Sequence, residues 1–99
     1  MILLITYDKK NFLKNYDSFY NTIKTANSWW HHLNNTWLIK TDEDPTYWYN
    51  LLAPHILAND RLLIIEVKPN YQGWLNEDAW KWINDQFRSE NNMFLGGIF

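Results

Sequence analysis

The stretch SWWHHLNNTWLIKT, residues 28–41, decides the fold, because it predicts a β-hairpin near the middle of the chain. Asn34 and Asn35 separate two strand-like runs, and asparagine tolerates the positive φ that a two-residue hairpin turn requires. We therefore expect one strand at residues 29–33 and its antiparallel partner at residues 36–40.

A strand and a helix are predicted on each side of this hairpin. Residues 2–7 are a short apolar run typical of a strand buried on both faces, and residues 15–26 carry apolar side chains at helical spacing. After the hairpin, Asp44 is a good N-cap and Pro45 fits the first position of a second helix. A further buried strand is predicted at residues 61–68.

The last third of the sequence predicts one more helix and a tail. Pro54 is expected to end the second helix, and Asn76 to cap a third one, with Trp74 packing at its entry. The third helix has an apolar stripe made by Trp80, Ile83 and Phe87. Residues 88–99 are polar and then apolar, and we expect either a short edge strand or disorder there.

The predicted order is strand, helix, strand, strand, helix, strand, followed by an added helix. Right-handed crossovers then give a four-stranded antiparallel sheet with two helices on one face, which is the ferredoxin-like α+β arrangement. We predict a single domain over residues 1–99, with a core at about 1–87. The second face of the sheet needs cover from the C-terminal helix or from a second subunit, so a homodimer through the sheet or the tail is expected.

Composition narrows the classes of function. The chain has 99 residues, of which 46% are hydrophobic, with seven Trp, six Tyr and five Phe. Nine basic and eleven acidic residues give a net charge of −2, and the absence of a Lys/Arg block argues against a strong phosphate-backbone binder. There is no cysteine, which excludes disulfides, thiolate zinc sites and a cysteine nucleophile. Without a long apolar run or a secretory signal, a soluble cytoplasmic protein is expected.

Four stretches carry a resemblance to known proteins: LLITYD, WWHHLNNTWLIKTD, NDRLLIIEV and GWLNEDAW. Together they resemble small bacterial and phage proteins that are labelled SinR-family. A more remote similarity is to the small CRISPR-associated adaptation protein and to VapD-like toxins, whose first strand ends in an aspartate where this chain has Tyr7-Asp8. The arginine-rich helix of the adaptation proteins is replaced here by the neutral residues 16–27.

The resemblance implies Asp8 as a candidate catalytic and metal-binding residue. Two copies of Asp8 across a dimer axis would hold Mg²⁺ in a metal-dependent nuclease, and His31 would assist as a general base or ligand. The alternative, which local geometry favours, is that Asp8 caps a turn or the following helix. His31 and His32 are adjacent, so on a strand they face opposite sides, and packing or solvation is the more frequent fate of such histidines. His55 is expected to close the second helix.

Four tryptophans are the candidate interaction surface: Trp29, Trp30, Trp37 and Trp74. Base stacking on such rings normally comes with neighbouring Lys or Arg, so core packing or a protein contact is favoured. We therefore expect a small dimeric protein-interaction module of a phage, mobile-element, defence or toxin–antitoxin system, with no cofactor. The alternatives are the Mg²⁺-dependent nuclease and a nucleic-acid-binding protein without catalysis.

Overall fold

The computed structural model describes residues 1–11 and 13–95, with side chains described up to residue 90. It is an α+β fold, as predicted, built on one four-stranded antiparallel sheet of order β2-β3-β1-β4. The elements in chain order are β1 (Ile2–Asp8), α1 (Asp17–Ile23), β2 (Ser28–Leu33), β3 (Thr36–Lys40), α2 (Pro45–Leu52), the 3-10 turn η1 (Ala53–His55), β4 (Arg61–Val67) and α3 (Glu77–Leu95).

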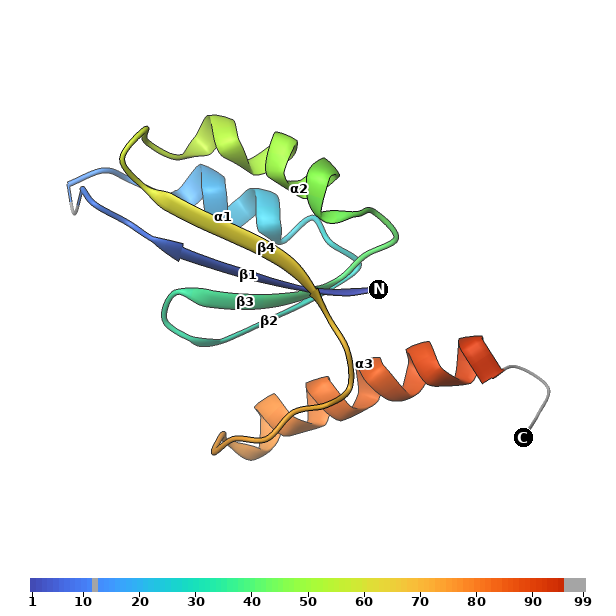
Figure 1. Ribbon diagram of the computed structural model, residues 1–99. Coiled ribbons are helices and arrows are strands. Elements are labelled where there is room, and N and C mark those ends of the chain that lie inside the picture. Colours follow the sequence, from blue (N-terminus) through green and yellow to red (C-terminus); the bar gives the residue numbers. More distant parts are fainter. Residues whose placement is uncertain (12, 96–99) are drawn as a thin grey trace.

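Helices cover the two faces of the sheet unequally (Figure 1). α1 and α2 lie side by side on one face, whereas α3 lies across the other face near one end. The alternation of β3 fits this arrangement, because Trp37 and Ile39 pack toward α1 and α2 while Leu38 packs toward α3. Neighbouring residues of β3 therefore face opposite sides of the sheet.

The core between the sheet and the first two helices is the larger one. Its centre is made of fully buried side chains from the sheet and from both helices: Leu3, Ile5, Phe19, Ile23, Trp37, Ile39 and Leu52. The second core joins Ile2, Trp30 and Leu38 of the sheet to Ala79, Ile83 and Phe87 of α3. The apolar stripe predicted for the third helix thus packs on the sheet.

The boundaries of α2 follow from its end residues. The Asp44 carboxylate accepts a hydrogen bond from the Tyr47 backbone N–H at 2.9 Å, and Pro45 is the first helical residue. The helix ends at Leu52, and Pro54 lies in the 3-10 turn that follows. Both sequence signals are therefore confirmed.

Three predictions about local structure are wrong. Residues 88–95, expected as an edge strand or disorder, belong to α3, whereas residues 96–99 lie outside the described residues. Trp74 is 99% exposed and packs against nothing at the entry of α3. β4 is only half-buried, because α3 leaves its outer positions uncovered: Leu63 is 54% and Ile65 is 48% exposed.

Candidate functional site

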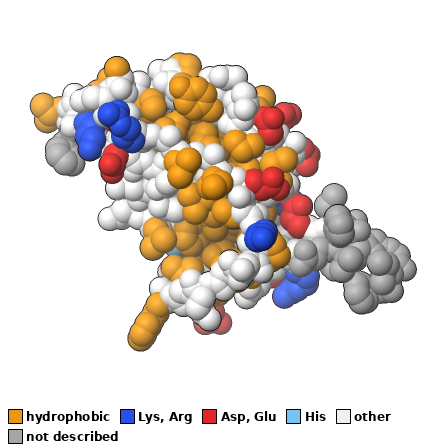
Figure 2. All heavy atoms as spheres, in the orientation of Figure 1, with side chains coloured by type: hydrophobic (Ala, Val, Ile, Leu, Met, Phe, Trp, Pro, Cys, Tyr) orange, Lys and Arg blue, Asp and Glu red, His pale blue; other side chains and the backbone are white. Residues whose placement is uncertain are grey.

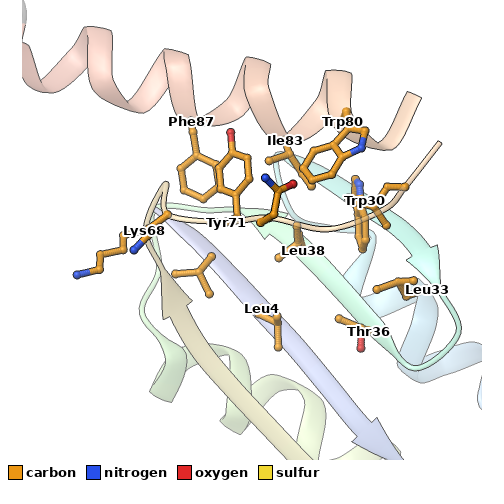
Figure 3. A pocket seen from close by; sticks show the side chains of 14 residues that line it. Leu4, Trp30, Leu33, Thr36, Leu38, Lys68, Tyr71, Trp80, Ile83 and Phe87 are labelled. Atoms are coloured by element: carbon orange, nitrogen blue, oxygen red, sulfur yellow. The ribbon is translucent and has the colours of Figure 1, made fainter. Parts of the chain in front are cut away.

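An apolar groove of about 290 Å³ lies between α3, the segment of residues 68–75 and the sheet. Figure 3 shows the side chains that line the groove, with those of the sheet on one side and those of α3 on the other. Leu4 and Leu38 of the sheet form the floor, and Trp80 and Ile83 of α3 stand over it. The groove results directly from the alternation in β1 and β3, because the floor residues point away from α1 and α2.

Aromatic stacking fixes the wall of the groove that belongs to the 68–75 segment. The Tyr71 ring stacks on Trp80 with centroids 6.0 Å apart and on Phe87 with centroids 5.5 Å apart. Its hydroxyl donates a hydrogen bond to the Asn84 side-chain oxygen at 2.7 Å. Offset ring pairs and a hydroxyl bond together orient Tyr71. The groove is therefore lined by oriented rings that belong to two different segments.

One buried and one partly buried tryptophan tie α3 to the hairpin at the other end of the groove. Trp30 Nε1 donates to the Ala79 carbonyl at 3.1 Å, and Trp82 Nε1 donates to the Ser28 hydroxyl at 2.8 Å. These bonds satisfy the indole N–H groups while the rings stay in the apolar layer. These two hydrogen bonds therefore help to fix the position of α3 relative to the hairpin.

The apolar surface extends from the hairpin end of the groove over the open part of the sheet. Leu33 at the hairpin end is 48% exposed, and Leu63 and Ile65 on β4 are exposed to a similar degree. Figure 2 shows hydrophobic side chains gathered over the middle of this view, between the helical layer and α3. A continuous apolar surface of this kind, rimmed by polar residues, is typical of sites that bind another macromolecule or a ligand.

The tryptophans named in the sequence separate into two groups. Trp30 and Trp37 are 3% and 1% exposed, so the prediction that they form part of an interaction surface is wrong. They belong to the two cores because their strands place them under α3 and α1. Trp29 is 41% and Trp74 is 99% exposed, and these two remain available to a partner.

Asp8 ends β1 opposite Arg61 and is exposed at the end of the sheet. Its carboxylate lies 3.6 Å from the Lys10 ammonium. Asp8 caps neither the loop nor α1 in the described part of the chain, and the expectation of a cap is wrong. The side-chain oxygens of Asn11 and Asn15 do this locally, accepting from the backbone N–H of Leu13 and Asp17 at 2.9 and 2.7 Å.

His31 belongs to the aromatic cluster rather than to the strand end that carries Asp8. Its ring stacks on Trp37 with centroids 3.9 Å apart, and its Nε2 is 3.0 Å from the Asn34 carbonyl oxygen. No hydrogen bond or ion pair joins it to Asp8 within the described chain. His32 lies on the opposite side, beside Trp30, with ring centroids 5.2 Å apart. Opposite orientation of the adjacent histidines was predicted and is observed.

His55 lies in η1, as expected for a residue that closes α2, and it contacts α1. Its Nδ1 is 3.0 Å from the Ser18 hydroxyl oxygen. The Lys14 ammonium donates to the His55 carbonyl at 3.1 Å. These contacts tie the end of α2 to α1 and to the loop before it.

Asp60 is a buried carboxylate that the sequence pattern does not single out. It accepts hydrogen bonds from the backbone N–H of Lys10 at 2.8 Å and of Leu57 at 2.9 Å, and from the Tyr16 hydroxyl at 3.0 Å. Burial by itself would raise the pKa of Asp60, but these hydrogen bonds and the nearby Lys14 charge hold that pKa below its usual value. Burial and the adjacent Asp60 carboxylate raise the pKa of Tyr16.

Tyr7 is the second buried phenol of this region. Burial raises its pKa to about 12, while the hydrogen bond from Trp37 Nε1 to the Tyr7 hydroxyl, at 2.9 Å, acts in the opposite direction. A phenol with so high a pKa stays neutral at ordinary pH and serves as a hydrogen-bond acceptor for the buried indole. Its contribution is to the structure of the core.

Metal chemistry receives little support from the arrangement of acidic and imidazole groups. Among the described residues, no group of three or more His, Cys, Asp or Glu side chains is close enough to hold a metal ion. Asp8 belongs to no such group among the described residues. Its assignment as a Mg²⁺ ligand therefore stays a prediction that depends on a second copy.

Comparison with known proteins gives no assignment: no family model, no curated protein and no solved structure matches the chain. Within the described residues, none of the helices is long and apolar enough to cross a membrane. The groove and the adjoining sheet face are thus the features on which a functional proposal can rest.

Proposed function

We propose that this chain is a small protein-interaction module that acts as a homodimer and binds a segment of another protein in the groove between α3 and the sheet. The observation that carries the proposal is the groove itself, an apolar depression of about 290 Å³ with half-exposed aliphatic side chains beside it. Monomeric proteins seldom leave such a surface uncovered.

The lining of the groove favours a peptide or protein over a charged small molecule. Its walls are aromatic and aliphatic, and the polar groups at its rim come from Lys68, Asn70 and Gln72. Amide side chains at the edge of an apolar groove can bond to an extended backbone, while the groove takes the apolar side chains. Trp74, fully exposed in the same segment, offers a large ring to the same partner.

We also propose that the fold is ferredoxin-like. The order β1-α1-β2-β3-α2-β4, the antiparallel sheet order β2-β3-β1-β4 and the placement of α1 and α2 on one face support this. The resemblance of four stretches to SinR-labelled bacterial and phage proteins supports a phage, mobile-element or defence setting. This fold hosts unrelated functions, so the surface carries the functional argument.

Site-specific photo-crosslinking in cells tests the interaction module. A benzophenone amino acid at Leu33, which lines the groove, is expected to give a covalent adduct with one protein of reproducible mass. The same amino acid at Asn50, an exposed residue of α2 on the opposite side, is the matched control and is expected to give none. Adducts at both positions, or at neither, would contradict the proposal.

The nuclease alternative rests on the exposure of Asp8 at a strand end with lysines in the following loop. It predicts Mg²⁺-dependent cleavage of RNA or DNA that disappears in Asp8→Ala. If cleavage is absent, or is the same in the variant, this function is refuted. A salt-sensitive gel shift without cleavage would instead indicate nucleic-acid binding.

A further inference from the structure

β4 is an edge strand with a free outer side. The sheet order places it next to β1 alone, and within residues 1–11 and 13–95 no other element bonds to its backbone. Its seven residues, Arg61–Val67, contain neither proline nor glycine. Every second backbone N–H and C=O of such a strand points outward, ready to pair with another strand.

The features that usually prevent edge pairing, such as proline, charged side chains and bulges, are missing from the middle of β4. Leu63 and Ile65 are half-exposed on the open face of the sheet, and the charged residues Arg61 and Glu66 stand near the two ends. The other edge strand, β2, differs because its register with β3 is irregular between Trp30 and Leu33. A bulged edge is a poor template for pairing. β4 is therefore the edge that is suited to take a strand.

Charge is segregated along the direction of β4. The register places Arg61 opposite Asp8, so the basic loop after β1 lies at the start of β4; its lysines are Lys9, Lys10 and Lys14. At the other end, Val67 is opposite Ile2, which is opposite Lys40, and there the acidic residues 42–44 and Glu66 outnumber Lys40 and Lys68. Figure 2 shows mainly basic groups, with one acidic group beside them, at one end, and several acidic groups with basic groups among them at the other.

We propose that a second copy of this chain pairs antiparallel with β4 and continues the sheet. An antiparallel copy places the basic end of each protomer beside the acidic end of the other, so its charge pattern is self-complementary. Residues that lie opposite each other on the two β4 strands must be on the same face of the sheet. The register can therefore differ from full overlap only by an even number of residues. Full overlap of seven residues sets Ile64 opposite Ile64 of the second copy and Leu63 opposite its Ile65. This deepens the proposed function and rests on its dimeric part.

Cysteine crosslinking tests both the partner and the register, since the chain contains no cysteine. In the double variant Leu63→Cys/Ile65→Cys, each new thiol lies opposite a thiol of the second copy. Mild oxidation is expected to convert it to covalent dimer. Each single variant is expected to crosslink far less, because its two thiols are offset by two residues and exceed the Cα separation a disulfide allows. Asn50→Cys, exposed on α2, measures random collision.

Sedimentation equilibrium supplies an independent readout. The wild-type chain is expected to have twice the mass of its 12.1 kDa monomer. In Leu63→Lys/Ile65→Lys, like charges face each other across the strands, and the dimer dissociation constant is expected to rise at least about tenfold. Circular dichroism checks that both variants are folded, and the half-exposed positions make this attainable.

Two results would overturn the proposal: a wild-type monomer at the highest soluble concentration, or a dimer that neither crosslinks through residues 63 and 65 nor weakens with lysines there. Neither result bears on the groove, because Leu63 and Ile65 do not line it. If the Leu33 adduct persists while β4 pairing fails, the second-copy proposal is lost, a monomeric chain also refutes the homodimeric part of the proposed function, and groove binding stands. If pairing holds and the adduct is missing, groove binding alone is refuted.

Discussion

Replacing Asp60 by asparagine is expected to destabilise the fold strongly, although it changes only one oxygen to an amide nitrogen. The carboxylate accepts from two backbone N–H groups, Lys10 at 2.8 Å and Leu57 at 2.9 Å, through different oxygens. Asparagine has one acceptor oxygen, so one of the two N–H groups must face an NH₂ group. A partly buried donor without a partner costs about 1–3 kcal/mol, and the bonds to a charged acceptor are also lost.

The expected loss in the free energy of unfolding for Asp60→Asn is therefore about 2–3 kcal/mol. For a domain of this size each kcal/mol corresponds to roughly 4–8 °C in melting temperature. Urea unfolding followed by tryptophan fluorescence measures the change, because both cores contain tryptophan. Asp8→Asn is the matched control, since it removes the same charge from an exposed position that makes no cap, and its urea midpoint is expected to stay unchanged.

The stability of wild type and of Asp60→Asn, measured as a function of pH, tests the direction of the Asp60 pKa shift. The pKa of Asp60 is lowered in the folded state, so its contribution to stability is present above the unfolded pKa of about 3.9 and is lost as pH falls through the folded value. The difference in stability between wild type and Asp60→Asn is therefore expected to shrink below about pH 4. A loss below about 0.5 kcal/mol at neutral pH, or a difference independent of pH, would refute the structural role assigned to Asp60.

Three further predictions concern the helix start and the main core. Asp44→Ala removes the carboxylate that caps α2 through the Tyr47 N–H, and a loss of about 1 kcal/mol is expected in urea unfolding; no loss would mean that the cap does not form. Ile39→Ala leaves a cavity at a fully buried position and is expected to cost about 2–5 kcal/mol, so a loss under 1 would show that the core is looser than described. Absorbance at 295 nm is expected to show late ionisation of the two buried phenols, Tyr7 and Tyr16, with Tyr7 ionising near pH 12; Tyr7→Phe should remove the step near pH 12, and a complete titration by pH 11 would contradict the burial of Tyr7.

The backbone elements could be predicted because each has a strong local signal. The Asp44-Pro45 pair marks the start of α2, and the Asn34-Asn35 pair marks the hairpin turn, because both depend on dihedral preferences of neighbouring residues. The length of α3 could not be predicted. Residues 88–92 are all polar and interrupt the apolar stripe of the helix, so the sequence pattern gives no signal that the helix continues to Leu95.

The surface was harder to predict than the elements, because exposure depends on which neighbour covers each residue. Trp37 and Trp74 are the same residue type, yet one is enclosed by α1 and the hairpin and the other is fully exposed. Asp60 was missed because a carboxylate beside asparagine in a turn is common, and two of its three donors, Lys10 and Tyr16, are distant in sequence. A pattern within one chain segment does not reveal such contacts.

The groove likewise has no local signature. Its floor comes from β1 and β3, its walls from α3 and its rim from residues 68–75, and these meet only because α3 folds back over the end of the sheet. Tyr71 and Trp80, which stack at 6.0 Å, appear in the sequence as a loop tyrosine and a helix tryptophan. Only the placement of α3 converts the apolar stripe into one side of a binding surface.

Amide hydrogen–deuterium exchange tests the central claim most directly, with the chain alone and with the protein that the Leu33 crosslink captures. Groove binding predicts that the partner slows exchange in residues 68–75 and in the adjoining hairpin residues 30–33, and leaves residues 46–52 of α2 unchanged. Slower exchange confined to residues 8–14 and 59–62, at the sheet end that carries Asp8, would contradict the groove as the site of function. It would move that site to the strand end instead.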